Sequence, residues 1–148
     1  MPSPEHRLIG HSIDVSSPLM NVEKYRYIVV EGPIGVGKTS LARRIAAETG
    51  AQALLEQPEE NPFLERFYRD AARYALPTQM FFLFQRMNQL RDLAQTDLFS
   101  APVISDFLID KDPIFATLTL ADDELNLYRQ MFDHFSPAAP RPDLVVYL

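Results

Sequence analysis

Residues 29–40 read VVEGPIGVGKTS, and this stretch decides the fold. From Gly32 the spacing is G-x-x-x-x-G-K-T, which is the pattern of a phosphate-binding P-loop. The residues before it, YRYIVV from Tyr25 to Val30, are aromatic and β-branched, as is typical of a buried strand. The residues after Lys38 have helical spacing and stop at Gly50. Strand, glycine loop and helix in this order favour a P-loop over an ordinary strand-to-helix turn with a surface lysine.

Each part of this loop has a chemical reason to hold phosphate. The glycines let the backbone turn with several N–H groups inward, and the following helix adds the positive end of its dipole. Lys38 can reach the β- and γ-phosphates, and the Thr39 hydroxyl can ligate magnesium. We therefore expect ATP and Mg²⁺ as ligands. The residues expected to bind the phosphates are Gly32, Pro33, Ile34, Gly35, Val36, Gly37, Lys38, Thr39 and Ser40.

Length and composition set the class of protein. The chain has 148 residues, 47% apolar and 23% charged, which fits one globular domain. Its net charge of -6 argues against general binding to nucleic acid or to an anionic membrane. The lack of cysteine excludes disulfides and thiolate metal sites and favours the cytoplasm. No stretch resembles a signal peptide or a membrane span, so we expect a mobile extension at residues 1–24 and a P-loop domain at 25–148.

Strands and helices alternate along the rest of the chain. This alternation predicts an α/β fold with a parallel sheet and flanking helices. Further strands are expected at Gln52–Glu56, Ala101–Phe107 and Asp143–Leu148. Helices are expected at 63–75, from Pro77 to Phe99 with Pro77 near the start, and after a cap at Thr119 or Asp122.

Glu56 stands at the carboxyl end of the second expected strand. Ligands of open α/β sheets bind beyond these ends, so Glu56 could take a proton from an acceptor hydroxyl. The alternative is a solvated acidic loop, because Glu59 and Glu60 follow directly. Residue type alone does not decide between the two.

Four blocks in a fixed order make a family resemblance specific. They are EGPIGVGKTSLA, LLEQPEENPFLERFY, QMFFLFQR and VISDFLIDKDPIFA. Together they resemble the deoxynucleoside kinase family, in particular its bacterial deoxyadenosine and deoxyguanosine kinase branch, over residues 25–148. The resemblance implies a P-loop NTPase-like sheet. It also implies transfer of the γ-phosphoryl group of ATP to the 5′-hydroxyl of a deoxynucleoside, with a purine base, in nucleotide salvage.

The resemblance also implies roles for single residues. Glu56 corresponds to the general base and acts with Lys38 as the catalytic pair, while Tyr68 corresponds to a tyrosine that touches the sugar 3′-hydroxyl. Gln79 corresponds to the base-reading glutamine, whose amide offers both a donor and an acceptor. Arg86 lies seven residues later, on the same side of a helix. The alternatives are a core role for Tyr68 and a surface charge at Arg86. Phe81, Phe82 and Phe84 are expected in the core rather than stacked on the base, although one of them could line the pocket.

The third expected strand departs from the wider family at its end. Many members have an acidic residue followed by arginine and serine there, where this chain has Ser105, Asp106 and Phe107. Asp106 could contact the base or help to hold Mg²⁺ through water. Alternatively, it caps the next helix.

The resemblance predicts features beyond residue 148 as well. Family members continue with an arginine-rich lid and a further strand, so we expect a C-terminally truncated kinase in which Arg141 is the only arginine near the end. A homodimer through helices like 77–99 and the one after Asp122 is implied. Two other functions stay open. One is a P-loop module that binds nucleotide without efficient catalysis, because the lid is absent. The other is a different P-loop kinase, such as a nucleoside monophosphate kinase, which would need an arginine cluster beside Glu56.

Overall fold

The structure is a computed structural model that describes residues 24–95 and 101–148. The expected N-terminal extension therefore lies outside the described residues, except for Lys24. The end of the helix expected to reach Phe99 lies outside them too.

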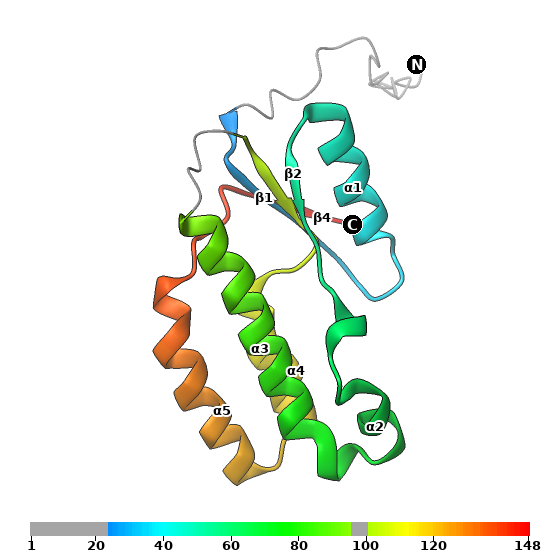
Figure 1. Ribbon diagram of the computed structural model, residues 1–148, viewed down its shortest axis with the longest axis vertical. Coiled ribbons are helices and arrows are strands. Elements are labelled where there is room, and N and C mark those ends of the chain that lie inside the picture. Colours follow the sequence, from blue (N-terminus) through cyan, green and yellow to red (C-terminus); the bar gives the residue numbers. More distant parts are fainter. Residues whose placement is uncertain (1–23, 96–100) are drawn as a thin grey trace, which may run out of the picture.

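The described residues form four strands and five α-helices in alternating order (Figure 1). The strands are β1 (Tyr27–Glu31), β2 (Gln52–Leu54), β3 (Val103–Ser105) and β4 (Leu144–Tyr147). The helices are α1 (Lys38–Thr49), α2 (Leu64–Arg69), α3 (Ala71–Gln95), α4 (Asp112–Thr119) and α5 (Asp122–Phe135). Short 3₁₀ turns lie at η2 (Pro58–Glu60), η3 (Ile109–Lys111) and η4 (Ser136–Ala138).

The sheet is parallel throughout and has the order β2-β3-β1-β4. Tyr27 is in register with Val103, and Ile28 with Leu144, so β1 is central and β4 lies at one edge of the described sheet. The prediction of an α/β fold with a parallel sheet is confirmed. Because parallel strands end at the same edge, the loops after β1, β2 and β3 meet there.

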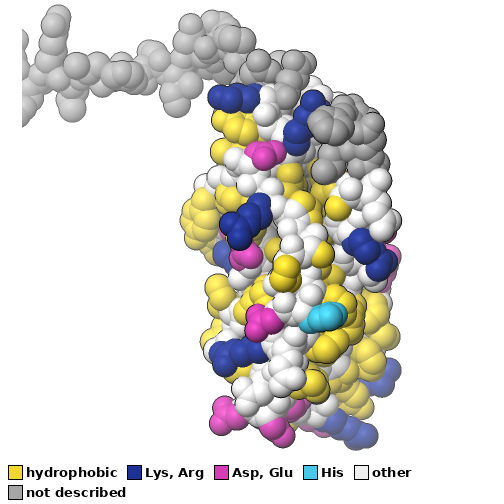
Figure 2. Space-filling model, turned by 90° about the vertical axis from the view of Figure 1, so that its left-hand side faces the viewer, with side chains coloured by type: hydrophobic (Ala, Val, Ile, Leu, Met, Phe, Trp, Pro, Cys, Tyr) yellow, Lys and Arg dark blue, Asp and Glu magenta, His cyan; other side chains and the backbone are white. Residues whose placement is uncertain are grey.

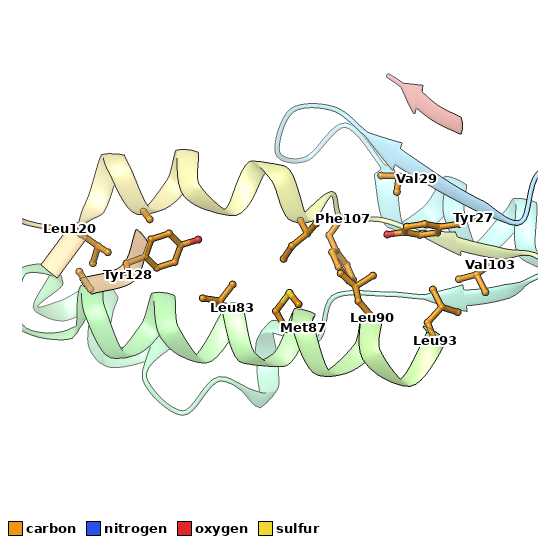
Figure 3. Close-up of a cluster of buried hydrophobic side chains, with 13 residues drawn as sticks. Tyr27, Val29, Leu83, Met87, Leu90, Leu93, Val103, Phe107, Leu120 and Tyr128 are labelled. Carbon is orange, nitrogen blue, oxygen red and sulfur yellow. The ribbon is translucent and has the colours of Figure 1, made fainter. Parts of the chain in front are cut away.

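The inner strands β1 and β3 are buried on both faces of the sheet, and β1 divides its side chains between the two faces. Ile28 and Val30 pack with Ala42 of α1 on one face. Tyr27 and Val29 join the larger core on the other face, to which α3, α4 and α5 contribute. Figure 3 shows Leu83 and Met87 of α3 pointing toward α4 and Phe107, and Leu93 lying next to Val103 of β3. This strand alternation also places Glu31 on the face of Tyr27 and Val29.

Helix α3 corrects two expected boundaries. The helical conformation is interrupted at Asp70, whose backbone is not helical. Helix α3 then begins at Ala71 and runs through Pro77. The physical reason is capping: the Asp70 carboxylate accepts from the Arg73 backbone N–H at 3.4 Å and starts a new helix. Pro77 therefore lies within α3 and leaves one helical hydrogen bond unmade. The extensive burial of α3 is what offsets this loss.

The expected cap of α5 was also wrong. Ala121 is the N-cap of α5, and it makes no side-chain capping bond. Thr119 is the last residue of α4, a helix that the sequence did not predict, and its hydroxyl donates to the Phe115 carbonyl. Three acidic residues in the first turn of α5 favour its start through the helix dipole instead: Asp122, Asp123 and Glu124.

The described part of the chain contains no helix long and apolar enough to cross a lipid bilayer.

The pKa of the buried Tyr27 hydroxyl predicts how the stability of the fold changes at alkaline pH. Burial raises the pKa of the Tyr27 hydroxyl from 10.0 to about 12, the Ser105 hydroxyl lowers it in part, and Asp110 raises it. Between pH 10 and 12 the unfolded chain therefore loses a proton that the folded chain keeps. Stability should fall by about 2–3 kcal/mol across this window. In Tyr27→Phe this part of the fall should disappear in urea unfolding measured at pH 9 to 12, and an unchanged fall would refute the assignment.

Candidate nucleotide and acceptor site

A cavity of about 620 Å³ opens at the carboxyl ends of the strands. Its wall is formed by the loop after β1, the segment after β2, the inner side of α3, and the segment from β3 into α4. Pockets for small ligands are commonly of this size. The cavity therefore lies where an α/β sheet is expected to bind its ligand.

The loop after β1 has the backbone that a phosphate cradle needs. Gly35 and Gly37 have φ of 79° and 100°, and a Cβ added at either would meet no atom within 4 Å. Gly37 is the N-cap of α1 and offers no side-chain acceptor to the first-turn amides. Those amides can instead donate to a phosphate oxygen. Lys38 begins α1, and its Nζ donates to the Gly32 carbonyl oxygen at 2.8 Å, across the mouth of the loop.

Asp106 joins the phosphate loop to the segment after β2. Its Oδ2 accepts from the Thr39 hydroxyl at 2.6 Å, and its Oδ1 accepts from the Glu56 backbone N–H at 2.9 Å. The side chain is buried, so these bonds fix its position. The alternative that Asp106 caps the next helix is wrong, because α4 begins six residues later with Lys111 as its N-cap.

Glu56 meets Arg86 across the cavity. The Arg86 guanidinium contacts the Glu56 carboxylate through Nε at 3.0 Å and through its second terminal nitrogen. It also contacts Asp112. Burial alone would lower the pKa of the Arg86 guanidinium, but Glu56 and Asp112 outweigh burial and raise it. Arg86 is thus a permanent cation between two carboxylates, and its alternative role as a surface charge is wrong.

Asp112 is the centre of a buried network. Its side chain is fully buried, and its Oδ2 accepts from the Gln79 amide nitrogen at 3.2 Å and from the Tyr128 hydroxyl. Burial raises the pKa of the Tyr128 hydroxyl, and the adjacent Asp112 carboxylate raises it further, so Tyr128 remains a donor. Gln79 and Arg86, seven residues apart on α3, are therefore fixed by one carboxylate.

Comparison with known proteins agrees with this geometry. The family model for deoxynucleoside kinases matches residues 28–148, a range that contains every site residue described in this subsection. The chain belongs to the deoxynucleoside kinase family.

Several relatives in the deoxynucleoside kinase family are similar over most of the chain. Deoxyguanosine kinase of Bacillus subtilis (strain 168) is 36% identical over 123 residues, which cover 82% of this chain and 59% of that protein. Deoxyadenosine/deoxycytidine kinase of the same bacterium is 29% identical over 136 residues, covering 86% and 61%. The solved structure of deoxyadenosine kinase from M. mycoides, with the products dCMP and a flexible dCDP bound, superposes with a TM-score of 0.71 at 25% identity. It covers 82% of this chain and 62% of that one. The chain thus spans about three fifths of the length of these deoxynucleoside kinases.

The substrate-binding and catalytic residues that the deoxynucleoside kinase resemblance predicts share one cavity but differ in how exposed they are. Lys38, Glu56, Gln79, Arg86 and Asp106 line the same cavity. Tyr68 lines it as well but is 77% exposed, so its alternative role as a core tyrosine is wrong.

Of the three phenylalanines on α3, one belongs to the cavity. Phe82 lines it, and the Arg86 guanidinium lies 5.1 Å from the centre of its ring. Phe84 is 39% exposed, and its ring makes an edge contact with Phe135. None of Phe81, Phe82 and Phe84 is fully buried, so the prediction of core packing is only partly right, and Phe82 is the one that lines the pocket.

Several residues in and around the site were missed from the sequence, and Asp112 and Asn61 are two of them. Asp112 belongs to the block VISDFLIDKDPIFA, whose resemblance to the family predicts no role for it. Its one local signal is its place before Pro113 at a helix start. Asn61 is buried; its amide nitrogen donates to the Thr78 carbonyl at 3.1 Å and its oxygen accepts from the Phe63 N–H at 3.0 Å. It holds the segment after Glu56 against α3.

The oxygens near Thr39 suit magnesium. A hydroxyl and a carboxylate, on Thr39 and Asp106, lie side by side, and Mg²⁺ prefers oxygen ligands. Residues 24–95 and 101–148 contain no group of three or more acidic, histidine or cysteine side chains that could hold a metal alone. This donor set therefore fits an ion that takes its other ligands from phosphate and water.

Proposed function

We propose that this chain carries the catalytic site of an ATP-dependent deoxynucleoside kinase. The observation that carries the proposal is that one cavity joins the phosphate loop with Lys38 to a carboxylate, Glu56, and to the amide of Gln79. A purine deoxynucleoside, phosphorylated in nucleotide salvage, is the acceptor that best fits relatives named deoxyguanosine and deoxyadenosine kinases.

Glu56 is positioned to act as the general base. Both of its contacts with Arg86 are to Oε1, so Oε2 is the oxygen that can accept from a substrate hydroxyl. In the proposed step Glu56 accepts the 5′-hydroxyl proton as the 5′-oxygen forms a bond to the γ-phosphorus. The bond from this phosphorus to the oxygen that bridges it to the β-phosphate breaks, and that oxygen keeps the electron pair, so ADP leaves.

The phosphate side of the reaction is electrostatic. Lys38 and the amides of the loop hold the β- and γ-phosphates, and Thr39 with Asp106 would hold Mg²⁺. Bound there, the ion would neutralise charge on the phosphates. Lys38 would leave its bond to the Gly32 carbonyl and donate to a phosphate oxygen instead.

Base recognition is proposed for Gln79. Its amide nitrogen donates to Asp112. This bond fixes the orientation of the Gln79 amide, and with it the position of the amide oxygen as an acceptor for the base. Arg86 and Phe82 add a cation and an aromatic face to the same pocket. For Tyr68 at the rim we propose contact with the sugar 3′-hydroxyl, as the family resemblance implies.

A nucleoside monophosphate acceptor fits this pocket less well. Its phosphate would need free cations beside Glu56. Arg86 is already bound to two carboxylates, and Asp106 adds a third acidic group nearby. An uncharged 5′-hydroxyl is the better match for this environment.

We also propose a homodimer and a cytoplasmic location. The face of the molecule on the α5 side carries hydrophobic side chains interspersed with charges of both signs (Figure 2). Phe84 of α3 and Leu127 of α5 are exposed at 39% and 49%. Pairing through α3 and α5 would bury both side chains. Leu127→Glu should therefore weaken the dimer, and the molar masses of this variant and of the unsubstituted chain in light scattering test the pairing.

The function is tested by the phosphate site. Lys38→Ala should weaken ATP binding at least tenfold in isothermal titration with Mg²⁺, because charge-assisted bonds to the phosphates are lost. It should also abolish ADP release stimulated by any of the four deoxynucleosides. The matched control is Lys24→Ala, a lysine remote from the loop whose ammonium lies 6.0 Å from the Tyr25 ring centre.

The outcomes separate the candidate functions. ATP binding without ADP release in the unsubstituted chain would favour a nucleotide-binding module. Equal ATP affinity in Lys38→Ala and the unsubstituted chain would contradict the P-loop assignment itself.

A further inference from the structure

Two of the three lysines in the chain meet at one carboxylate. The sequence contains 14 lysines and arginines, and its only lysines are Lys24, Lys38 and Lys111. Lys38 and Lys111 approach the same atom, Oε1 of Glu31, at 3.8 and 2.8 Å. The two ammonium groups are thus neighbours across a single oxygen atom, although 73 positions separate them in the sequence.

Glu31 is fixed in place by the strand before it. It ends β1 on the buried face of Tyr27 and Val29, and it is only 5% exposed. Its Oε1 also accepts from the Gly32 backbone N–H at 2.8 Å. A buried carboxylate needs such partners, and it positions them in return.

Lys111 comes from the acceptor side of the cavity. It is the N-cap of α4 and directly precedes Asp112 of the base pocket. Its ammonium lies 5.9 Å from the centre of the Tyr147 ring at the end of β4, and the cavity is lined by Lys38, Glu56 and Lys111 together. Lys111 therefore stands between the phosphate loop and the acceptor pocket, where the group to be transferred must pass.

We propose that Lys111, held by Glu31 beside Lys38, binds the terminal phosphate of the nucleotide donor as a second cation. This inference rests on the proposed kinase function. The cavity also holds Glu31, Glu56, Asp106 and Asp112, so a polyphosphate needs more positive charge than Lys38 alone supplies. The Lys111 side chain is 36% exposed and its ammonium has three N–H donors, so it can donate to a phosphate oxygen while it keeps its contact with Glu31.

A purely structural ion pair makes a different prediction. If Lys111 only neutralised Glu31, replacing it would lower the stability of the fold and weaken all nucleotides alike. A contact with the terminal phosphate acts on ATP and not on ADP. The ratio of the two affinities therefore isolates the proposed contact and does not depend on turnover.

The experiment is isothermal titration of ATP and of ADP, each with Mg²⁺, into the unsubstituted chain and three variants. In Lys111→Gln the preference for ATP over ADP should shrink about five- to tenfold, as expected for a lost charge-assisted bond in a partly exposed site. Lys111→Arg should retain most of the preference. Lys24→Gln makes the same change at the remaining lysine and should retain all of it. Thermal unfolding of each variant checks that the fold persists.

Each outcome decides the assignment. A narrowed ratio in Lys111→Gln, restored in Lys111→Arg, supports it. An unchanged ratio, or an equal loss for ATP and ADP, overturns it and leaves the kinase proposal standing. An unsubstituted chain that binds neither nucleotide contradicts the proposed function, and the role of Lys111 falls with it.

Discussion

Glu56→Gln should slow deoxynucleoside phosphorylation by about 10²–10⁴, the usual cost of losing a general base. The glutamine oxygen can still accept from Arg86, so the shape of the site and its contact with α3 remain. The amide that then faces the substrate cannot accept a proton. Affinity for the deoxynucleoside should change far less than kcat. Steady-state ADP release at saturating ATP, together with titration of the deoxynucleoside, measures both quantities.

The neighbouring acidic loop supplies the control for Glu56. Glu59 lies three residues later, in the exposed turn η2, and Glu59→Gln removes the same charge without touching Arg86. Its kcat should equal that of the unsubstituted chain. If Glu56→Gln also retained its kcat, the proton acceptor would have to be another group, and Asp106 would be the first to test because its Oδ1 binds the Glu56 backbone.

The phosphate loop could be predicted from the sequence because its information is local. The strand, the glycines, Lys38 and the helix stop at Gly50 are contiguous, and their roles follow from backbone conformation. The parallel sheet could be predicted for a similar reason, since alternation of strands and helices restricts the topology to few choices. The same alternation of strands and helices is enough to place Glu56 beyond the carboxyl end of β2.

The buried network could not be predicted in the same way. Arg86 pairs with Glu56 and Asp112 across 30 and 26 positions, and no spacing rule relates residues so far apart. Tyr128, which donates to Asp112, lies on another helix, 16 positions further along the chain. The break at Asp70 was missed because Pro77 gave the stronger local signal, although a capping aspartate decided where α3 begins.

Arg86→Leu should destabilise the fold by about 3–5 kcal/mol, because it leaves Asp112 as a buried charge without a cation. The Arg86 side chain is 12% exposed and that of Asp112 is fully buried, so water cannot replace the lost partner. The Glu56 side chain is 36% exposed, so solvent reaches its carboxylate and the loss of Arg86 costs less there. With total stabilities of about 5–15 kcal/mol for typical domains, such a loss is large. Urea unfolding followed by circular dichroism measures it.

Two further variants separate the charge from the packing of the side chain. Arg91→Leu makes the same substitution on α3 at an exposed position and should cost less than about 1 kcal/mol. Asp112→Asn in the Arg86→Leu background removes the uncompensated charge, while its side-chain oxygen can still accept from Tyr128. The double variant should therefore be more stable than Arg86→Leu alone. If it is less stable, or if Arg86→Leu costs no more than Arg91→Leu, Asp112 does not depend on Arg86 for its charge. Tyr128 and Gln79 would then suffice to keep a carboxylate at the centre of the base pocket.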